Sequence, residues 1–301
     1  MLLLLTLVPL ALIGFIVNEV DDDDDNSPAE QEGDTLTGGD TDDVIEGTTG
    51  NDVVQAGDGN DVVFADAGSD QGSGGAGNDI IDGGAGNDDL NGSLGRDWID
   101  GDNGNDTING GFGEDTLLGG AGADSIDGGA GDDLIFGGDI SGVDLNIDQA
   151  TGILDGSLTF EQAAGLTELD DNILPLSDAD DDVADTLVGG DGNDSMIIGS
   201  GDQATGGAGF DDFVILADSL DNAPNLSTVT DFVPGEDAIV VLDDLDLPDA
   251  PTISVLTSGE DAVVALNGTP VTVVQGAAGN LSAEDIAFFT GISIGFLDTA
   301  P

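Results

Sequence analysis

GGAGNDIIDGGAGNDDLNG, residues 74–92, repeats one order of residue types at an interval of nine. Glycine and aspartate are poor formers of helices and strands, so a chain that folds here must gain something that offsets the entropy of ordering them. Glycine, Asn and Asp tolerate positive φ and so permit tight turns. The last three residues of each unit have the length and alternation of a short strand. The stretch therefore predicts turns and short strands in strict alternation.

The same unit extends in both directions without a gap. Eleven rows of nine residues run from Gly38 to Phe136. Column four is Gly in every row except at Thr41, and column eight is Ile, Val or Leu in every row except at Gly72. Column six is always aspartate: Asp43, Asp52, Asp61, Asp70, Asp79, Asp88, Asp97, Asp106, Asp115, Asp124 and Asp133. Column four thus suits a turn, column eight suits a hydrophobic core, and column six can supply a carboxylate to a ligand.

A second, shorter array at residues 180–214 carries Asp185, Asp194 and Asp211 in column six. One of its rows, IGSGDQAT, has only eight residues, which predicts one irregular coil. The row QEGDTLT places Asp34 and Leu36 in phase, as a degenerate half-repeat. We therefore divide the chain into six parts. They are an apolar N-terminal segment (1–17), an acidic linker with the half-repeat (18–37), a first array (38–138), an insertion loop or small subdomain (139–179), a second array (180–214) and a C-terminal cap (215–301).

The cap has less glycine and more β-branched residues. STVTDFV, DAIVVL, PTISVL, DAVVALNG and PVTVVQG have the two-residue period of antiparallel strands, and Asn267-Gly268 is a hairpin turn signal. The predicted fold is all-β: a parallel β-roll, which is a kind of β-solenoid, with a β-rich C-terminal cap. Two rows make one coil, the column-eight side chains point inward, and coils stack at about 4.8 Å.

Such stacking places aspartates 18 residues apart above one another on two edges. Asp43, Asp61, Asp79, Asp97, Asp115 and Asp133 would share one edge, and Asp52, Asp70, Asp88, Asp106 and Asp124 the other. Carboxylates so close repel each other unless a cation lies between them. Ca²⁺ accepts about 6 to 8 oxygens in loose geometry, whereas Mg²⁺ demands a small octahedron. We expect multiple Ca²⁺ ions to bind these carboxylates and the column-six Asp185, Asp194 and Asp211.

Glycine carbonyls in columns two and four would supply further oxygens. The candidates are Gly57, Gly59, Gly75, Gly77, Gly84, Gly86, Gly95, Gly104, Gly111, Gly113, Gly120, Gly122, Gly129, Gly131, Gly190, Gly192, Gly207 and Gly209. Because one aliphatic side chain per row stabilises by only about 1.5 to 3 kcal/mol, the array should be unfolded without calcium.

The composition excludes several classes of function. The chain has 64 acidic residues against one basic residue, Arg96, for a formal charge of −63. Nucleic acid and anionic lipid headgroups are therefore not expected as partners, since both require basic patches. The chain has no Cys and no His, so the usual zinc, thiol and imidazole chemistries are excluded too. Calcium ions are the expected partner.

The first 17 residues, MLLLLTLVPLALIGFIV, are apolar. Three interpretations are open: an uncleaved membrane anchor, a secretory signal, and a mispredicted start or buried segment. The first two place the acidic region outside the cytoplasm, at the bacterial surface or beyond it, and the anchor would tether the protein to a membrane.

The rows resemble the GGxGxDxUx nonapeptide of RTX calcium-binding repeats, over residues 38–138 and 180–214. GGAGFDDFVI followed by TVTDFVPGEDAIVVL also resembles the segment that closes the roll in serralysin-like and other type I secreted proteins. The resemblance implies a parallel β-roll, export through a type I apparatus with an uncleaved C-terminal signal, and folding on external Ca²⁺. The apolar N-terminal run departs from that pattern.

Three functional hypotheses follow. The first is a non-enzymatic, calcium-folded protein of the cell exterior with a structural, adhesion or matrix role. The second is a secreted hydrolase or epimerase with a catalytic part in residues 139–183 or the cap, although a chain without His can form neither a zincin HExxH site nor a Ser-His pair. The third is an adhesin that binds sugar or ice through columns seven and nine. We favour the first and expect no enzymatic activity.

Overall fold

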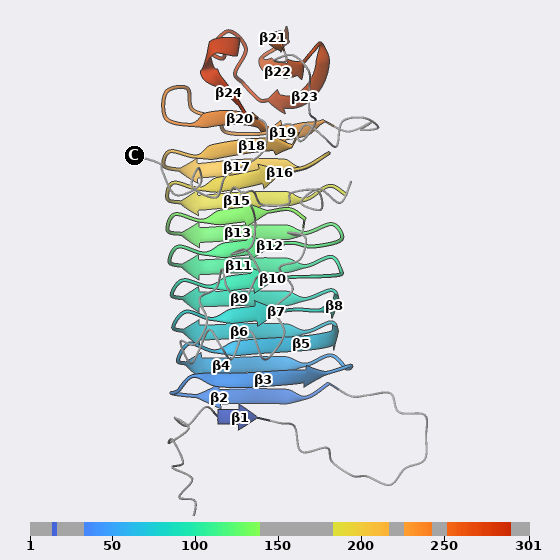
Figure 1. Cartoon of the computed structure of the whole chain (residues 1–301), viewed down its shortest axis with the longest axis vertical. Helices are drawn as coiled ribbons and strands as arrows, with labels where there is room; N and C mark the ends of the chain where they lie inside the picture. Colours follow the sequence, from blue (N-terminus) through green and yellow to red (C-terminus); the bar gives the residue numbers. More distant parts are fainter. Residues whose placement is uncertain (1–13, 17–32, 139–182, 217–225, 243–251, 290–301) are drawn as a thin grey trace, which may run out of the picture.

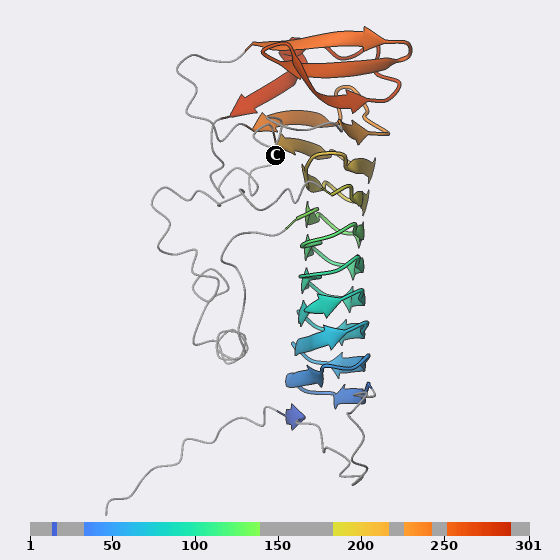
Figure 2. The same ribbon diagram turned by 90° about the vertical axis from the view of Figure 1, so that its right-hand side faces the viewer.

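The computed structural model describes residues 14–16, 33–138, 183–216, 226–242 and 252–289. Figure 1 shows a tall stack of coils with the cap at one end, and Figure 2 shows its two sheets facing each other. The predicted all-β, parallel β-roll is confirmed. Along sheet A the strand order is β1-β3-β5-β7-β10-β12-β14-β16-β18-β20-β24, and along sheet B it is β2-β4-β6-β9-β11-β13-β15-β17-β19-β23-β22-β21.

Sheet A contains β1 (Gly14–Ile16), β3 (Asp43–Thr48), β5 (Val62–Gly68), β7 (Ile80–Asp82), β10 (Trp98–Asp100), β12 (Thr116–Leu118), β14 (Leu134–Phe136), β16 (Ser195–Ile198), β18 (Asp212–Leu216), β20 (Ala238–Leu242) and β24 (Ile286–Phe289), and β8 (Ala85–Gly86) pairs with the end of β5. Sheet B contains β2 (Thr35–Gly39), β4 (Val53–Asp58), β6 (Gln71–Ala76), β9 (Asp89–Leu94), β11 (Thr107–Phe112), β13 (Ser125–Ala130), β15 (Thr186–Asp191), β17 (Gln203–Ala208), β19 (Ser227–Val229), β23 (Thr269–Val274), β22 (Asp261–Leu266) and β21 (Ile253–Ser258). A short 3₁₀ helix, η4 (Ala283–Asp285), precedes β24.

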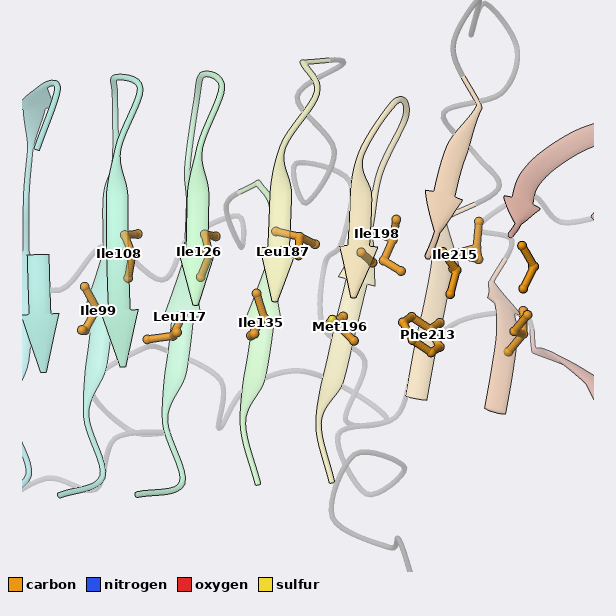
Figure 3. Packing of buried hydrophobic residues seen from close by; sticks show 14 of the residues in the cluster. Ile99, Ile108, Leu117, Ile126, Ile135, Leu187, Met196, Ile198, Phe213 and Ile215 are labelled. Atoms are coloured by element: carbon orange, nitrogen blue, oxygen red, sulfur yellow. The ribbon is translucent and has the colours of Figure 1, made fainter. Parts of the chain in front are cut away.

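In the regular coils the core consists mainly of column-eight side chains between the sheets. Ile99, Ile108, Leu117, Ile126 and Ile135 come alternately from sheets A and B and are 0–1% exposed. Figure 3 shows that they point toward one another. Gly72, which lacks a core side chain, leaves a position that Leu90 and Ile81 approach closely, since an added Cβ there would lie 3.1 Å from Leu90 Cδ2.

The inserted segment does not interrupt the stack. The amide of Asp124 donates to Asp185 Oδ1, and that of Asp133 donates to Asp194 Oδ1. Each pair is 61 residues apart, where regular neighbours are 18 apart. The 43 additional residues therefore leave one coil and return to the next without a change of register. The fold expected for residues 139–179 lies outside the described residues.

The prediction for the cap was partly wrong. β22 and β23 form the expected antiparallel hairpin, with Asn267 at φ 52° and Gly268 at φ 87° in its turn, and β21 pairs antiparallel with β22. STVTDFV and DAIVVL, however, supply β19 and β20, which pair in parallel with the strands of the roll. The antiparallel prediction for these two segments is therefore wrong. A two-residue period indicates a strand, but it does not tell whether the neighbouring strand runs parallel or antiparallel to it.

The N-terminal apolar run is described only at Gly14–Ile16, which forms β1 and pairs in parallel with β3. Within the described ranges, no helix has the length and apolarity to cross a membrane. The anchor and signal interpretations depend on residues 1–13, which lie outside them.

Candidate metal centres

Each edge of the roll carries one continuous column of buried aspartates. On the edge that leads into sheet A, the amide of each aspartate donates to Oδ1 of the aspartate one coil further on, over distances of 2.8 to 3.2 Å. This A-edge ladder contains Asp43, Asp61, Asp79, Asp97, Asp115, Asp133, Asp194, Asp211 and Asp237. The structure thus shows the predicted stacking of one set of column-six residues.

The edge that leads into sheet B has an equivalent ladder. This B-edge ladder contains Asp34, Asp52, Asp70, Asp88, Asp106, Asp124, Asp185 and Asp202, joined by the same amide to Oδ1 bonds. The eight-residue row causes the predicted shortening, since Asp185 and Asp202 are only 17 residues apart. The sequence-based assignment of two opposite edges is therefore correct.

Three members of the ladders were missing from the predicted set. Asp34 lies in the half-repeat, Asp202 in the eight-residue row and Asp237 in the cap. For Asp237 the signal was present in the letters GEDAI, where Gly, Asp and Ile stand in columns four, six and eight. The prediction of an antiparallel cap for this segment leaves its phase unused.

The environment of the second carboxylate oxygen distinguishes two groups among the ladder aspartates. In Asp61, Asp70, Asp79, Asp88, Asp97, Asp106, Asp115, Asp133 and Asp194, Oδ2 is buried and accepts no hydrogen bond within the described residues. We call these the open carboxylates. A buried anionic oxygen without a partner is strongly unfavourable, so these oxygens need a cation or a proton.

In the closed carboxylates, Asp52, Asp202 and Asp237, a main-chain amide of the same turn donates to Oδ2. The donors are Thr48 at 2.6 Å, Gly199 at 2.7 Å and Val233 at 2.6 Å. Each of these turns departs from the GGxG pattern. In these three turns the main chain itself thus satisfies the second carboxylate oxygen.

The column-one glycines border the open oxygens. A Cβ at Gly92 would lie 2.3 Å from Asp97 Oδ2 and 2.7 Å from the carbonyl oxygen of Gly110 in the next coil. The row at Gly110 repeats this, with Asp115 Oδ2 at 2.5 Å and the Gly128 carbonyl at 2.7 Å. Only glycine leaves room here, and the space it leaves faces one carboxylate oxygen and one carbonyl oxygen.

The predicted carbonyls of columns two and four lie differently. The column-four carbonyl of Gly59 points along the stack, 1.6 Å from where a Cβ of Gly77 would be, and the column-two carbonyl of Gly57 has the same relation to Gly75 at 2.1 Å. Positive φ is observed at Gly75 (115°) and Gly77 (139°), as expected for these turns. Column-one carbonyls, which the sequence analysis omitted, thus face the same space as the open oxygens, and ligation by the carbonyls of columns two and four stays a prediction.

Burial dominates the electrostatics of the ladders. Desolvation raises the pKa of Asp79 to about 7, against the hydrogen bond from the Asp61 amide, and the charge of Asp97 raises it further. The pKa of Asp97 is also raised to about 7 by burial, with Asp115 as the repelling neighbour. Charge is unfavourable at these sites until a cation compensates it.

This donor set fits calcium. No three acidic side chains of the described residues converge closely enough to bind a metal by themselves. Ligation would therefore combine open carboxylates with main-chain carbonyls, the hard oxygen donors that Ca²⁺ prefers. When bound, the ion would supply the positive charge that the buried oxygens lack.

Comparison with known proteins agrees with this geometry. Residues 37–72, 69–99, 87–117, 109–139 and 182–202 match the family described as RTX calcium-binding nonapeptide repeat. A search of curated proteins gave no match. The matched rows contain every open carboxylate. The coils formed by residues 37–139 and 182–202 are therefore RTX repeats, and repeats of this kind bind Ca²⁺.

Proposed function

We propose that this protein is exported and acts outside the cytoplasm as a calcium-folded structural module with an adhesion or matrix role. The observation that carries the proposal is the set of open carboxylates, whose Oδ2 atoms are buried without a partner in consecutive coils. A protein built in this way is unstable where calcium is scarce and ordered where it is plentiful. Extracellular calcium modules bind at about 10⁻⁴ to 10⁻³ M.

The surface supports a non-catalytic role. Column seven of sheet B presents a row of exposed polar side chains along one face of the roll, namely Gln71, Asp89, Thr107, Ser125, Thr186 and Gln203. A long, uniform polar face fits contact with an extended partner better than it fits the concave pocket of an enzyme. The C-terminal segment that resembles a roll-closing module supports export by a type I route.

A calcium titration followed by far-UV circular dichroism tests the calcium-folding part. We expect a transition from coil to β structure at submillimolar to millimolar Ca²⁺, and no equivalent transition with Mg²⁺. β structure that persists after thorough chelation at neutral pH would refute it. Assays with casein, esters and polysaccharides test the structural role, because turnover above a buffer control would favour the hydrolase or epimerase alternative.

A further inference from the structure

The outer face of sheet A is unexpectedly apolar and buried. Side chains in column nine should point away from the core, toward solvent, because column eight points inward. Yet five of them are only 0–2% exposed and are not part of the inner core: Leu118, Phe136, Ile197, Val214 and Val240. We call this set the outer stripe.

The outer stripe is continuous. Its members are register partners in the adjacent strands β12, β14, β16, β18 and β20. Their chain neighbours Leu117 and Ile135 point into the core, as Figure 3 shows. Sheet A therefore buries apolar side chains on both of its faces over these strands.

Sheet B does not share this property. At the corresponding column-nine positions, Asn91 and Asp127 are exposed, and Asn109, Val188 and Thr205 are partly exposed. Since both sheets have the same backbone repeat, the burial of the outer stripe is not a general consequence of the fold. Side chains at 0–2% exposure in an isolated chain must be covered by that same chain.

We propose that the outer stripe is a docking face within the molecule and that its occupant is the inserted segment, residues 139–182. The segment leaves the roll two residues after Phe136, a member of the stripe, and returns at Val183 beside the same coils. It carries enough apolar side chains to cover the stripe: Ile140, Val143, Leu145, Ile147, Ile153, Leu154, Leu158, Phe160, Leu166, Leu169, Ile173, Leu174 and Leu176.

Charge and distance favour this occupant over the N-terminal apolar run. The segment has acidic residues and no basic ones, and the stripe is uncharged, whereas the outer face of sheet B exposes Asp89 and Asp127. The N-terminal apolar run joins the roll at β1, which is separated from β12 by β3, β5, β7 and β10. The inserted segment is attached at the stripe itself.

Proteolysis of the calcium-bound full chain tests the proposal. A glutamate-specific protease would cut the segment after Glu161 and Glu168, and we expect docking to make these cuts slow. Phe136→Ala should accelerate them at least fivefold, because it removes the aromatic contact on the stripe. Val188→Ala, at the equivalent outer position of sheet B, is the matched control and should leave the rate unchanged. Equal rates in wild type and Phe136→Ala would overturn the proposal, as would accelerated cleavage at Glu30 and Glu32 only.

A thiol probe supplies a second readout, because the chain has no cysteine. Phe136→Cys should react slowly with a maleimide in calcium, and at least tenfold faster once the segment has been cut. Val188→Cys should react fast before and after cutting. Fast labelling of Phe136→Cys in the intact monomer would overturn the docking, as would slow labelling that persists after cutting or only in a dimer. Circular dichroism of the same samples reports separately whether the roll has folded with calcium.

Discussion

The roll and the antiparallel part of the cap, β21 to β23, use glycine in different ways. At Gly268 in the cap hairpin an added Cβ would meet nothing within 4 Å, so glycine serves only the positive φ of the turn. At Gly92 in the roll a Cβ would meet a buried carboxylate, and at Gly77 it would lie 1.6 Å from a carbonyl of the coil below. The cap folds around aliphatic side chains such as Val264 and Val274, whereas the roll has two ladders of buried carboxylates beside its aliphatic core. The cap should therefore tolerate the loss of calcium, and the roll should not.

Removal of calcium should give the largest effect. Chelation leaves the open carboxylates uncompensated, so we expect the amides of β4 to β16 to lose their protection from hydrogen exchange. Amides in β22 and β23 should remain protected longer, because their core contains no buried carboxylate. Exchange followed by mass spectrometry measures both regions in one sample. Loss of protection at the same rate in both would show that the two regions unfold as one unit.

Acid should restore part of what chelation removes. The pKa of Asp79 and of Asp97 is about 7 in the metal-free fold, against an ordinary value of 3.8. Below 3.8 folded and unfolded chains are both protonated and burial carries no electrostatic penalty, whereas between 3.8 and about 7 the unfolded chain loses its protons first and stability falls as pH rises. Chelated protein should therefore gain β structure as the pH is lowered from about 8 to about 5.

The calcium-bound protein should respond to acid in the opposite sense, because protons compete with Ca²⁺ for the same oxygens. The calcium midpoint measured by circular dichroism should therefore rise as pH falls. Light scattering controls for association, since protonation also reduces the net charge. A chelated chain that remains unfolded over the whole range would contradict this account of the ladders.

Gly92→Ala should destabilise the calcium-bound roll by about 2 to 4 kcal/mol, as expected for a steric clash in a buried network. The added methyl group would displace Asp97 Oδ2 from its position. Gly39→Ala is the matched control, because a Cβ there would lie 3.9 Å from Asp43 Oδ2. Urea denaturation in excess calcium measures both variants, and similar losses would show that the clash is relieved elsewhere.

Asp97→Asn compares an open carboxylate with a closed one. It should raise the calcium midpoint roughly tenfold, because charge count tunes calcium affinity. Asp52→Asn should change the midpoint roughly twofold or less, since Thr48 already donates to Asp52 Oδ2. Isothermal titration of both variants measures the difference. Equal shifts would mean that the closed carboxylate binds calcium as well.

Ser93→Gly should give the smallest effect, a gain of about 0.5 kcal/mol. Ser93 occupies column two with φ 83°, a conformation that costs a residue with a Cβ about 1 to 2 kcal/mol, part of which the backbone entropy of glycine cancels. Ser73→Gly in strand β6 should instead lose about 0.5 to 1 kcal/mol. Thermal unfolding in calcium compares them, and a loss in both would show that Ser93 makes a favourable contact that outweighs its strain.

The sequence was sufficient for whatever depends on period. The nine-residue repeat located the inward column, the two aspartate edges and the short coil at Asp202. In a stack of coils, residues that are one full coil apart in the sequence lie next to each other in space. The sequence was insufficient for strand direction in the cap and for the hydrogen bonds that close Asp52. It also left out the column-one carbonyls, since their orientation depends on backbone dihedrals that residue types alone do not fix. The burial of Phe136 was likewise hidden, because an apolar residue in an outward column does not reveal what covers it.

The hydrogen bond from the Asp124 amide to Asp185 Oδ1 shows that the pairing of adjacent coils does not depend on how many residues separate them in the sequence. The boundary between two coils accommodates an insertion of more than forty residues, and the next coil still pairs in the regular register. A new segment can thus be inserted at such a boundary without changing the register of the stacked strands on either side. For protein engineers the turn between β14 and β15 is a natural splice point for cargo whose presentation is to be switched by a mineral ion.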